Sequence, residues 1–327
     1  MIKKMKWIIV ILLVLILVSC SNTTAPNGNE KTVYVYIAGD INDNATIWVN
    51  GVEQSLSSDE NRSSAYDVFV SGNDVFVAGV SNDRATLWKN GIERTLANRS
   101  TATSVLIHHN DVYVTGWKRE RDIEMAVLWK NDEPQILSNY VSGAWSVFVS
   151  NNDTFVVGWN VVGWSGEVRS EEEEYFPKAT LWKNGEMQIL SDKSSCATSV
   201  VVSGNDVYVT GWVMDDANVT GKATLWKNGV AQTLSYLDSS ANSVFISGND
   251  VYVAGIADGS ATLWVNGVQQ TLSNDFTIAA SVYVDGSDVY VVGNNLGERR
   301  AILWKNGVEQ RLSDNASVAN SVFVVRR

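Results

Sequence analysis

The sequence predicts an all-β fold: a seven-bladed β-propeller of four-stranded antiparallel blades, closed by pairing of the C-terminal strand with the N-terminal blade. A segment similar to Ala-Thr-Leu-Trp-Lys-Asn-Gly returns seven times, at intervals of 38 to 53 residues, and the chain begins and ends inside a repeat. Repeats of about forty residues with short apolar runs are typical of rings of sheets. Only three prolines and no long helical period compete with this interpretation. The signature tryptophans are Trp48, Trp88, Trp129, Trp182, Trp226, Trp264 and Trp304.

Each repeat divides into four short strands joined by tight turns. Around Trp264 the expected strands cover residues 243–246, 251–255, 261–264 and 268–272. Gly-Asn and Asn-Gly pairs between them supply the positive φ angles of tight hairpins, so neighbouring strands are expected to be antiparallel. The strands are apolar on both faces, as blades packed between two others require.

The two ends of the chain are expected to share one blade. Residues 33–39 match the second strand of a repeat, and residues 319–324 match the first strand. A ring needs such a shared blade to cover its edge strands, whereas an open solenoid does not. Blade one is therefore expected to combine residues 33–57 with residues 319–325. A parallel β-helix is the alternative architecture, disfavoured by the hairpin turns inside each repeat.

The order of short motifs in each repeat carries a family resemblance. It runs Ala-x-Ser-Val-x-Val, Gly-Asn-Asp-Val-Tyr-Val-x-Gly, Ala-x-Leu-Trp-x-Asn-Gly and Leu-Ser, over residues 33–325. This order resembles the extracellular HAF-type repeats of bacterial exported proteins. The resemblance implies a propeller-like fold and no general activity. The Gly-His and Trp-Asp pairs of WD repeats and the paired glycines of kelch repeats are missing.

The first nineteen residues read as a signal peptide. Three lysines precede an apolar run of twelve residues, Trp7–Val18, and Leu-Val-Ser-Cys ends it at Cys20. A membrane span is the alternative, but it needs about twenty apolar residues. The ending resembles the lipobox of bacterial lipoproteins. The predicted organisation is residues 1–19 as lipoprotein signal peptide, 20–32 as lipidated flexible tether and 33–327 as propeller.

The lipoprotein resemblance implies an address. It makes Cys20 the lipidated first residue of the mature protein, with the membrane as partner, in the bacterial cell envelope. Ser21 stands where an Asp would resemble the inner-membrane retention signal, so the outer membrane or cell surface is favoured if the source is Gram-negative. The polar stretch that follows Cys20 is expected to be flexible. Cys196 is the one remaining cysteine, so no intramolecular disulfide is expected.

The charge of the chain argues against nucleic acid as a partner. The formal net charge is −11, with 36 acidic and 25 basic side chains, and the predicted signal peptide removes three of the lysines. Binding to phosphates requires clustered Lys and Arg, which an acidic surface lacks.

Loops of unequal length indicate a possible binding face. Between the second and third strands of blades three, four and five lie residues 117–125, 159–178 and 212–222, whereas three other blades have five residues there. Recognition is usually built on such loops. Tryptophan rings could stack on sugars or grip a peptide, although each could instead close the base of its own loop. The predicted ligand-binding tryptophans are Trp117, Trp145, Trp159, Trp164 and Trp212.

A second candidate position surrounds the axis. The middle residue of each Ala-x-Ser element varies while its neighbours scarcely change, and it could line a ligand site at the channel mouth or simply fill the hub. Tyr66 is included among the predicted ligand-binding residues for this reason. The varying residues are Tyr66, Thr103, Trp145, Thr198, Asn242, Ala280 and Asn320.

Catalytic and metal-binding patterns are hard to find. His108 and His109 occupy turn positions and have no third His or Cys partner nearby. The repeated turn aspartates fit ordinary turn chemistry, and no calcium loop is present. No phosphate loop, nucleophile elbow or Cys-x-x-Cys pair appears. We therefore expect no catalytic residue, no metal and no cofactor.

The predicted function is a lipid-anchored, non-enzymatic binding or scaffold protein of the bacterial envelope. It would recognise a glycan, peptide or protein partner on the face that carries the long loops of blades three to five. One alternative is a glycan-cleaving enzyme, which needs two carboxyl groups across the scissile bond; Asp215, Asp216 and Glu167 are its candidates. Another alternative is a subunit of an envelope assembly complex.

Overall fold

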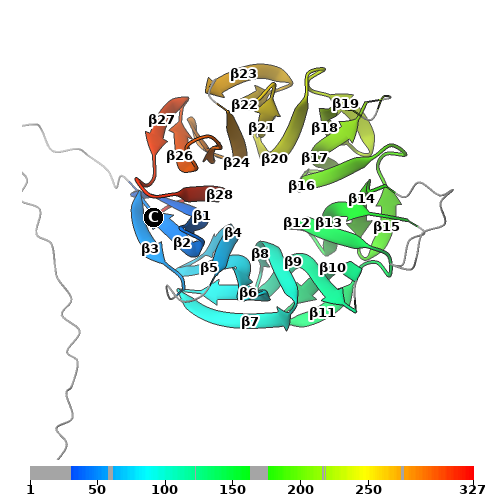
Figure 1. Cartoon of the computed structure of the whole chain (residues 1–327), viewed down its shortest axis with the longest axis horizontal. Coiled ribbons are helices and arrows are strands. Elements are labelled where there is room, and N and C mark those ends of the chain that lie inside the picture. Colours follow the sequence, from blue (N-terminus) through cyan, green and yellow to red (C-terminus); the bar gives the residue numbers. More distant parts are fainter. Residues whose placement is uncertain are drawn as a thin grey trace, which may run out of the picture. The chain divides into compact units, whose positions relative to one another are not determined.

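Seven four-stranded antiparallel sheets stand around a central axis as blades (Figure 1). The computed structural model describes residues 31–57, 62–121, 123–162, 176–215, 217, 219–273 and 276–327. Within these residues there are 28 strands and no helix. The predicted fold class and blade count are confirmed. The part of the chain that the structure describes has no helix with the length and hydropathy of a membrane span.

The first four blades follow one plan. The first strand of each blade lies nearest the hub, and the second, third and fourth strands follow in order toward the rim (Figure 1). Blade one consists of β28 (Ser317–Arg326), β1 (Val33–Ile41), β2 (Asn44–Val49) and β3 (Val52–Ser55). Blade two consists of β4 (Ser63–Ser71), β5 (Asp74–Ser81), β6 (Arg84–Lys89) and β7 (Ile92–Asn98). Blade three consists of β8 (Ser100–His108), β9 (Asp111–Glu120), β10 (Ile123–Lys130) and β11 (Glu133–Ile136). Blade four consists of β12 (Ser142–Ser150), β13 (Asp153–Asn160), β14 (Lys178–Lys183) and β15 (Glu186–Ile189).

The last three blades repeat the plan. Blade five consists of β16 (Ser195–Ser203), β17 (Asp206–Met214), β18 (Gly221–Lys227) and β19 (Val230–Thr233). Blade six consists of β20 (Ser239–Ser247), β21 (Asp250–Ala257), β22 (Ser260–Val265) and β23 (Val268–Ser273). Blade seven consists of β24 (Thr277–Asp285), β25 (Asp288–Asn295), β26 (Arg300–Lys305) and β27 (Val308–Arg311).

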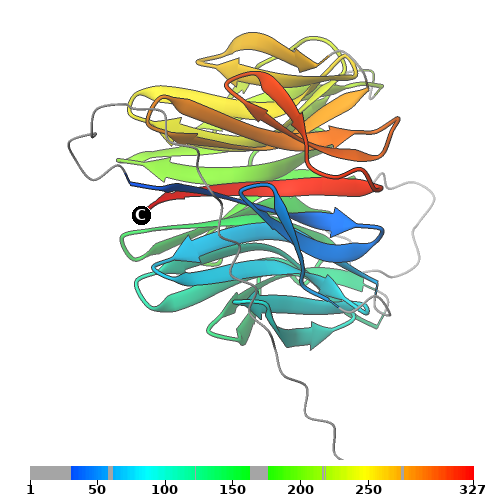
Figure 2. The same cartoon turned by 90° about the vertical axis from the view of Figure 1, so that its left-hand side faces the viewer.

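The C-terminal strand closes the ring, as predicted. β28 pairs antiparallel with β1 from the Val33 and Arg326 pair to the Ile41 and Ser317 pair. Figure 2 shows the two strands, red and dark blue, side by side in one sheet. Val322 of β28 is 4% exposed and packs with residues of blades one and seven. Blade one is therefore built from both ends of the described chain, and its inner strand holds the neighbouring blades together.

The two faces of the ring carry different connections. On the face we call the linker face, the turns between second and third strands bind the links that join one blade to the next. In blade four, for example, the backbone N of Val161 donates to the carbonyl of Val141 at 2.9 Å. The opposite face, here the turn face, carries the tight turns between first and second and between third and fourth strands. There Asn90 and Gly91 have φ angles of 51° and 77°, which explains the repeated Asn-Gly pair.

The signature tryptophans pack between blades. All seven are 0 to 1% exposed. Trp88 of blade two packs against Ala38, Ala45 and Ile47 of blade one. Small alanines next to a large indole allow neighbouring sheets to approach closely, as dense packing requires. The repeated Ala-Thr-Leu-Trp segment is thus the contact between successive blades.

Candidate functional site

A cavity of about 600 Å³ opens on the linker face across blades four to six. We call it the tryptophan groove. Three of the predicted ligand-binding residues, Trp145, Trp159 and Trp212, line it together. Its volume lies within the range of about 300–1,000 Å³ typical of small-molecule sites. Its lining residues are Val141, Trp145, Trp159, Val161, Pro177, Cys196, Thr198, Trp212, Ser240 and Asn242.

Trp159 and Trp212 stand on strands that are paired on both sides. Trp159 of β13 pairs with Gly143 and Ala179, and Trp212 of β17 has the equivalent pairing in blade five. A Cβ atom at Gly143 would lie only 2.9 Å from Nε1 of Trp159. The glycine therefore makes room for the indole over the inner strand. Both rings are half-buried and held by the sheet rather than by a loop.

Trp145 reaches the groove from a β-bulge. The register of β12 and β13 shifts between Ala144 and Ser146, so Trp145 is the extra residue of the inner strand. At this bulge the side chain of Trp145 is 40% exposed and lines the groove. Burial raises the pKa of the neighbouring Cys196 thiol to about 12, while a hydrogen bond with Trp145 acts in the opposite direction. The thiol is therefore protonated and uncharged at neutral pH.

The same bulge occurs in every blade at the varying residue of the Ala-x-Ser element. In four blades the side chain of this bulge residue donates a hydrogen bond to the backbone carbonyl of the alanine in the Ala-x-Ser element of the next blade, at 2.7 to 2.9 Å. These four residues thus form hydrogen bonds between neighbouring blades. This structural role corresponds to the alternative in which the varying residues fill the hub. The donors are Thr103, Thr198, Asn242 and Asn320.

Tyr66 is the bulge residue of blade two and is 36% exposed. Burial of its phenol raises the pKa of Tyr66, a hydrogen bond with Ser64 opposes this, and Asp40 adds a smaller upward effect. Tyr66 does not line the tryptophan groove. The structure therefore places this predicted residue at a separate part of the hub.

Trp117 also lies outside the groove. Like Trp159 and Trp212, it directly follows the glycine of the second strand in its own blade. It is half-buried, with the guanidinium carbon of Arg119 5.8 Å from its ring centre. The predicted loop 117–125 of blade three was wrong, because β9 and β10 continue their ladder through it, as far as the pair Glu120 and Ile123. The predicted loop 212–222 of blade five is shorter than expected, because β17 and β18 pair as far as Met214 and Gly221. Trp164 and Cys20 lie outside the described residues.

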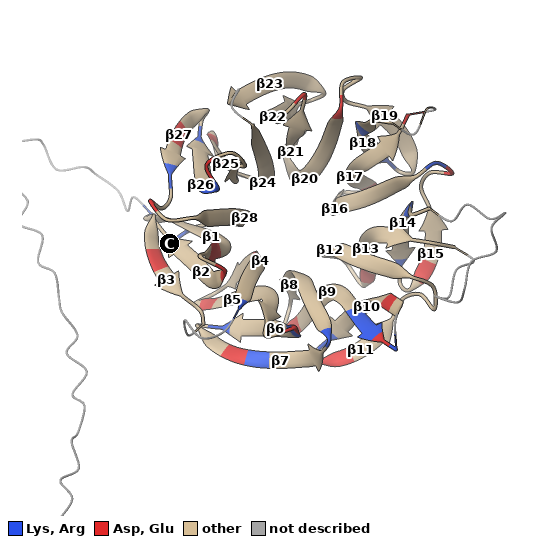
Figure 3. Ribbon diagram, viewed as in Figure 1, with Lys and Arg blue, Asp and Glu red and all other residues tan. Residues whose placement is uncertain are grey.

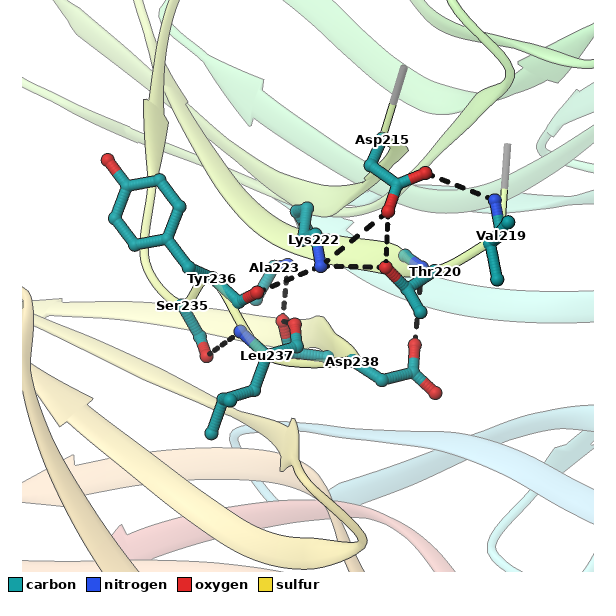
Figure 4. Close-up of polar contacts among 11 residues, drawn as sticks. Asp215, Val219, Thr220, Lys222, Ala223, Ser235, Tyr236, Leu237 and Asp238 are labelled. Carbon is teal, nitrogen blue, oxygen red and sulfur yellow. Dashed lines mark hydrogen bonds and ion pairs between the residues drawn. The ribbon is translucent and has the colours of Figure 1, made fainter. Parts of the chain in front are cut away.

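The acidic candidates for catalysis do not form a described pair. Asp215 accepts hydrogen bonds from Oγ1 of Thr220 at 2.6 Å and from the backbone N of Val219 at 3.1 Å (Figure 4). The Thr220 bond is the largest cause that lowers the pKa of Asp215. A lowered pKa disfavours the general-acid role, which requires a raised one. Asp216 and Glu167 lie outside the described residues.

Lys222 and Asp215 stabilise the connection between β17 and β18 beside the groove. Nζ of Lys222 donates to Oγ1 of Thr220 at 2.7 Å and to the carbonyl of Tyr236 at 2.8 Å. It lies 3.9 Å from the carboxylate of Asp215 (Figure 4). These contacts give the polar side chains of the connection a structural role.

The described residues that line the groove are uncharged: none of them is Asp, Glu, Lys, Arg or His. The inner strands β12, β16 and β20 contain no charged residue, and in Figure 3 they are tan while red and blue lie on outer strands such as β7. Among the described residues no group of three or more His, Cys, Asp or Glu side chains could hold a metal ion.

The turn aspartates and His108 have structural partners on the turn face. Asp74 accepts a hydrogen bond from Asn90 at 2.8 Å and pairs with Nζ of Lys89 at 2.7 Å. A ring nitrogen of His108 lies 3.1 Å from the carbonyl oxygen of Asn151. The predicted turn chemistry therefore accounts for these side chains.

Five groove residues were not singled out from the sequence: Val141, Val161, Pro177, Cys196 and Ser240. Cys196 pairs with Trp212 in the β16 and β17 ladder, and Ser240 holds the equivalent position in blade six. The available signal was their place two residues before the varying bulge residue of each blade. That signal requires the strand register, which spacing alone does not fix.

Comparisons with known proteins support the architecture. The β-propeller domain of the Trilobed protease from Pyrococcus furiosus, a propeller with an open velcro topology, matches with a TM-score of 0.54 and 13% identity over 88% of this chain and 94% of that one. The acylaminoacyl peptidase of Pyrococcus horikoshii gives 0.51 and 16% over 88% of this chain and 52% of that one. Hydrazine synthase of Kuenenia stuttgartiensis gives 0.51 and 10% over 91% and 47%.

This chain thus spans about half the length of the last two proteins. No protein-family model and no curated protein sequence matches it. At these identities the likeness shows the fold alone. The chain has the β-propeller architecture that also occurs in peptidases.

Proposed function

We propose that this chain is a lipid-anchored, non-enzymatic binding or scaffold protein of the bacterial envelope. Its ligand, a glycan, peptide or protein partner, binds in the tryptophan groove. The observation that carries the proposal is the convergence of Trp145, Trp159 and Trp212, from two blades, on one cavity whose described lining is uncharged. Exposed aromatic side chains held on a rigid scaffold are frequent anchors of binding sites.

The first strand of the propeller begins on the face that does not carry the groove. β1 begins on the turn face, where the backbone N of Val35 donates to Oδ1 of Asn50 in a tight turn. The groove opens on the linker face. The start of β1 and the opening of the groove therefore lie on opposite faces of the propeller.

The anchor is tested by expressing the full chain and its Cys20→Ala variant in a bacterial host and separating membranes from soluble protein. The proposal expects the parent in the membrane fraction, with lipid on Cys20 by mass spectrometry. The variant, which lacks the thiol, should lose that lipid. Mature parent protein without a lipid would contradict the anchor.

The groove is tested by a ligand screen that includes glycans, peptides and envelope proteins. The parent, from Ser21 to Arg327, is compared with a variant in which Trp145, Trp159 and Trp212 are all Ala. The proposal expects a ligand that the variant does not bind while its circular dichroism and melting temperature stay close to those of the parent. Ligands that bind both proteins equally would reject the groove as the site.

A further inference from the structure

We propose that the tryptophan groove binds an uncharged carbohydrate chain. This inference rests on the proposed function and names the class of its ligand. The features that carry it are the aromatic walls, the uncharged described lining, the small polar groups and the pairing of the strands that form the groove.

The aromatic walls suit sugar rings. Trp145 is 40% exposed, and Trp159 and Trp212 are half-buried with part of each surface in the groove. An indole offers a wide flat apolar surface at little conformational cost, with one N–H at its edge. The apolar C–H faces of a pyranose can stack on such surfaces. Because two of the indoles stand on ladder strands, the platform exists before a ligand arrives.

The uncharged side chains of the described lining disfavour several other ligand classes. The chain carries a net charge of −11, but no described residue that lines the groove is charged. Single-stranded nucleic acids also stack on aromatic rings, but they need a positively charged groove for the phosphates. Uronic acids, sulfated sugars and charged peptides would lose hydration without gaining an ionic partner.

Small uncharged polar groups lie at the hub side of the groove. Ser240 donates through Oγ to Oδ1 of Asn242 at 2.9 Å, and Oγ1 of Thr198 donates to the carbonyl of Ala241 at 2.7 Å. These bonds fix the side chains and leave oxygen lone pairs available to accept. Hydroxyl groups of a neutral sugar match such acceptors without requiring charge.

The strand pairing disfavours an extended peptide. Peptides often bind by adding a strand to a free sheet edge. β13 and β17, which carry Trp159 and Trp212, are already paired on both sides. At the bulge, the carbonyl of Ala144 beside Trp145 accepts Oγ1 of Thr103 at 2.8 Å. The groove thus offers side-chain surfaces instead of a backbone ladder.

The test measures binding of neutral oligosaccharides to the protein from Ser21 to Arg327 by calorimetry, with glucose-, galactose-, mannose- and N-acetylglucosamine-based series. Matched uronic-acid and sulfated oligosaccharides and charged peptides are run beside them. The variants are Trp145→Ala, Trp159→Ala and Trp212→Ala. Trp117→Ala is the control, because Trp117 has the same place in its blade but lies outside the groove.

The proposal expects a neutral series to bind, each groove variant to weaken binding by at least about tenfold, and the control to stay within about twofold. Phe at the same positions should retain part of the affinity, which separates stacking from misfolding. A preference for acidic sugars, or equal losses in Trp117→Ala, would overturn the inference.

Two outcomes separate this inference from the proposed function. If a peptide or protein binds and the three groove variants abolish it, the carbohydrate assignment fails and the binding function remains. If no ligand of any class is sensitive to the groove variants, both fail.

Discussion

Replacement of Asp67 should change stability in a pH-dependent way. In the other six blades a serine follows the bulge residue, whereas blade two has Asp67. Its Oδ2 accepts from Oγ of Ser104 and the backbone N of Val105, both at 2.9 Å. Its Oδ1 accepts from Oγ of Ser321 at 2.6 Å. One carboxylate thus connects blades one, two and three at the hub.

The magnitude follows from the groups that lose a partner. Asp67→Ala leaves the N–H groups of Val105 and Val68 and two hydroxyls without this acceptor, and each unsatisfied buried donor costs about 1–3 kcal/mol. Because the hydroxyls can rotate and the N–H groups cannot, we expect a loss of about 2–4 kcal/mol at neutral pH. Asp67→Ser should cost about 1 kcal/mol or less, since elsewhere Ser199 accepts the equivalent N–H, of Val244, at 3.3 Å.

The sign of the pH dependence follows from the pKa of Asp67. Burial raises this pKa above 3.8, and hydrogen bonds, that from Ser321 first, reduce the rise. The native state therefore holds the proton more tightly than the unfolded state. The extra stability that this bound proton gives the native state is fully present below pH 3.8 and is lost as the pH rises through the native pKa, while the carboxylate still accepts its hydrogen bonds.

The assay is urea unfolding of the parent and Asp67→Ser at several pH values upward from pH 4. The parent should lose stability relative to Asp67→Ser as the pH rises, since the serine variant lacks the titrating group. A difference between the two proteins that is independent of pH, or that changes in the opposite direction, would refute the reasoning.

Three further predictions concern the packing of the ring. Gly79→Ala should destabilise by about 1–3 kcal/mol or more in urea unfolding, because the new Cβ would lie 2.0 Å from the carbonyl oxygen of Ser64. Gly297→Ala, whose nearest atom lies at 3.5 Å, should be near neutral, and equal effects would be contrary to the fold. Trp88→Ala should cost about 3–5 kcal/mol, and a loss below about 1 kcal/mol would show that the indole is not between blades. Deletion of β28 should expose β1 as an edge strand and promote aggregation in light scattering; a monomeric, cooperatively melting product would contradict the closure.

The fold was predictable from the sequence because its determinants are local and repeated. The Asn-Gly pairs set the hairpins, and the Ala-Thr-Leu-Trp segment sets the contact between blades. The split repeat at the two ends required pairing of residues 33–39 with residues 319–324, and the structure has that pairing. The predictions that rest on these features do not change if a strand boundary is misplaced by one or two residues.

The candidate site was predictable only in part, because it depends on the register of the strands and on the direction in which their side chains point. Trp117, Trp159 and Trp212 look equivalent in the sequence, yet Trp159 and Trp212 line the groove, whereas Trp117 lies outside it near Arg119. The spacing of the sequence motifs also did not predict the β-bulge at Trp145. Whether the gathered tryptophans bind a ligand stays a prediction.

The most direct test is a crystal structure of the protein from Ser21 to Arg327 with the neutral oligosaccharide that binds it most tightly. The account predicts sugar rings stacked on Trp145, Trp159 or Trp212 within the groove on the linker face. Sugar bound elsewhere, with these indoles free of ligand, would contradict it.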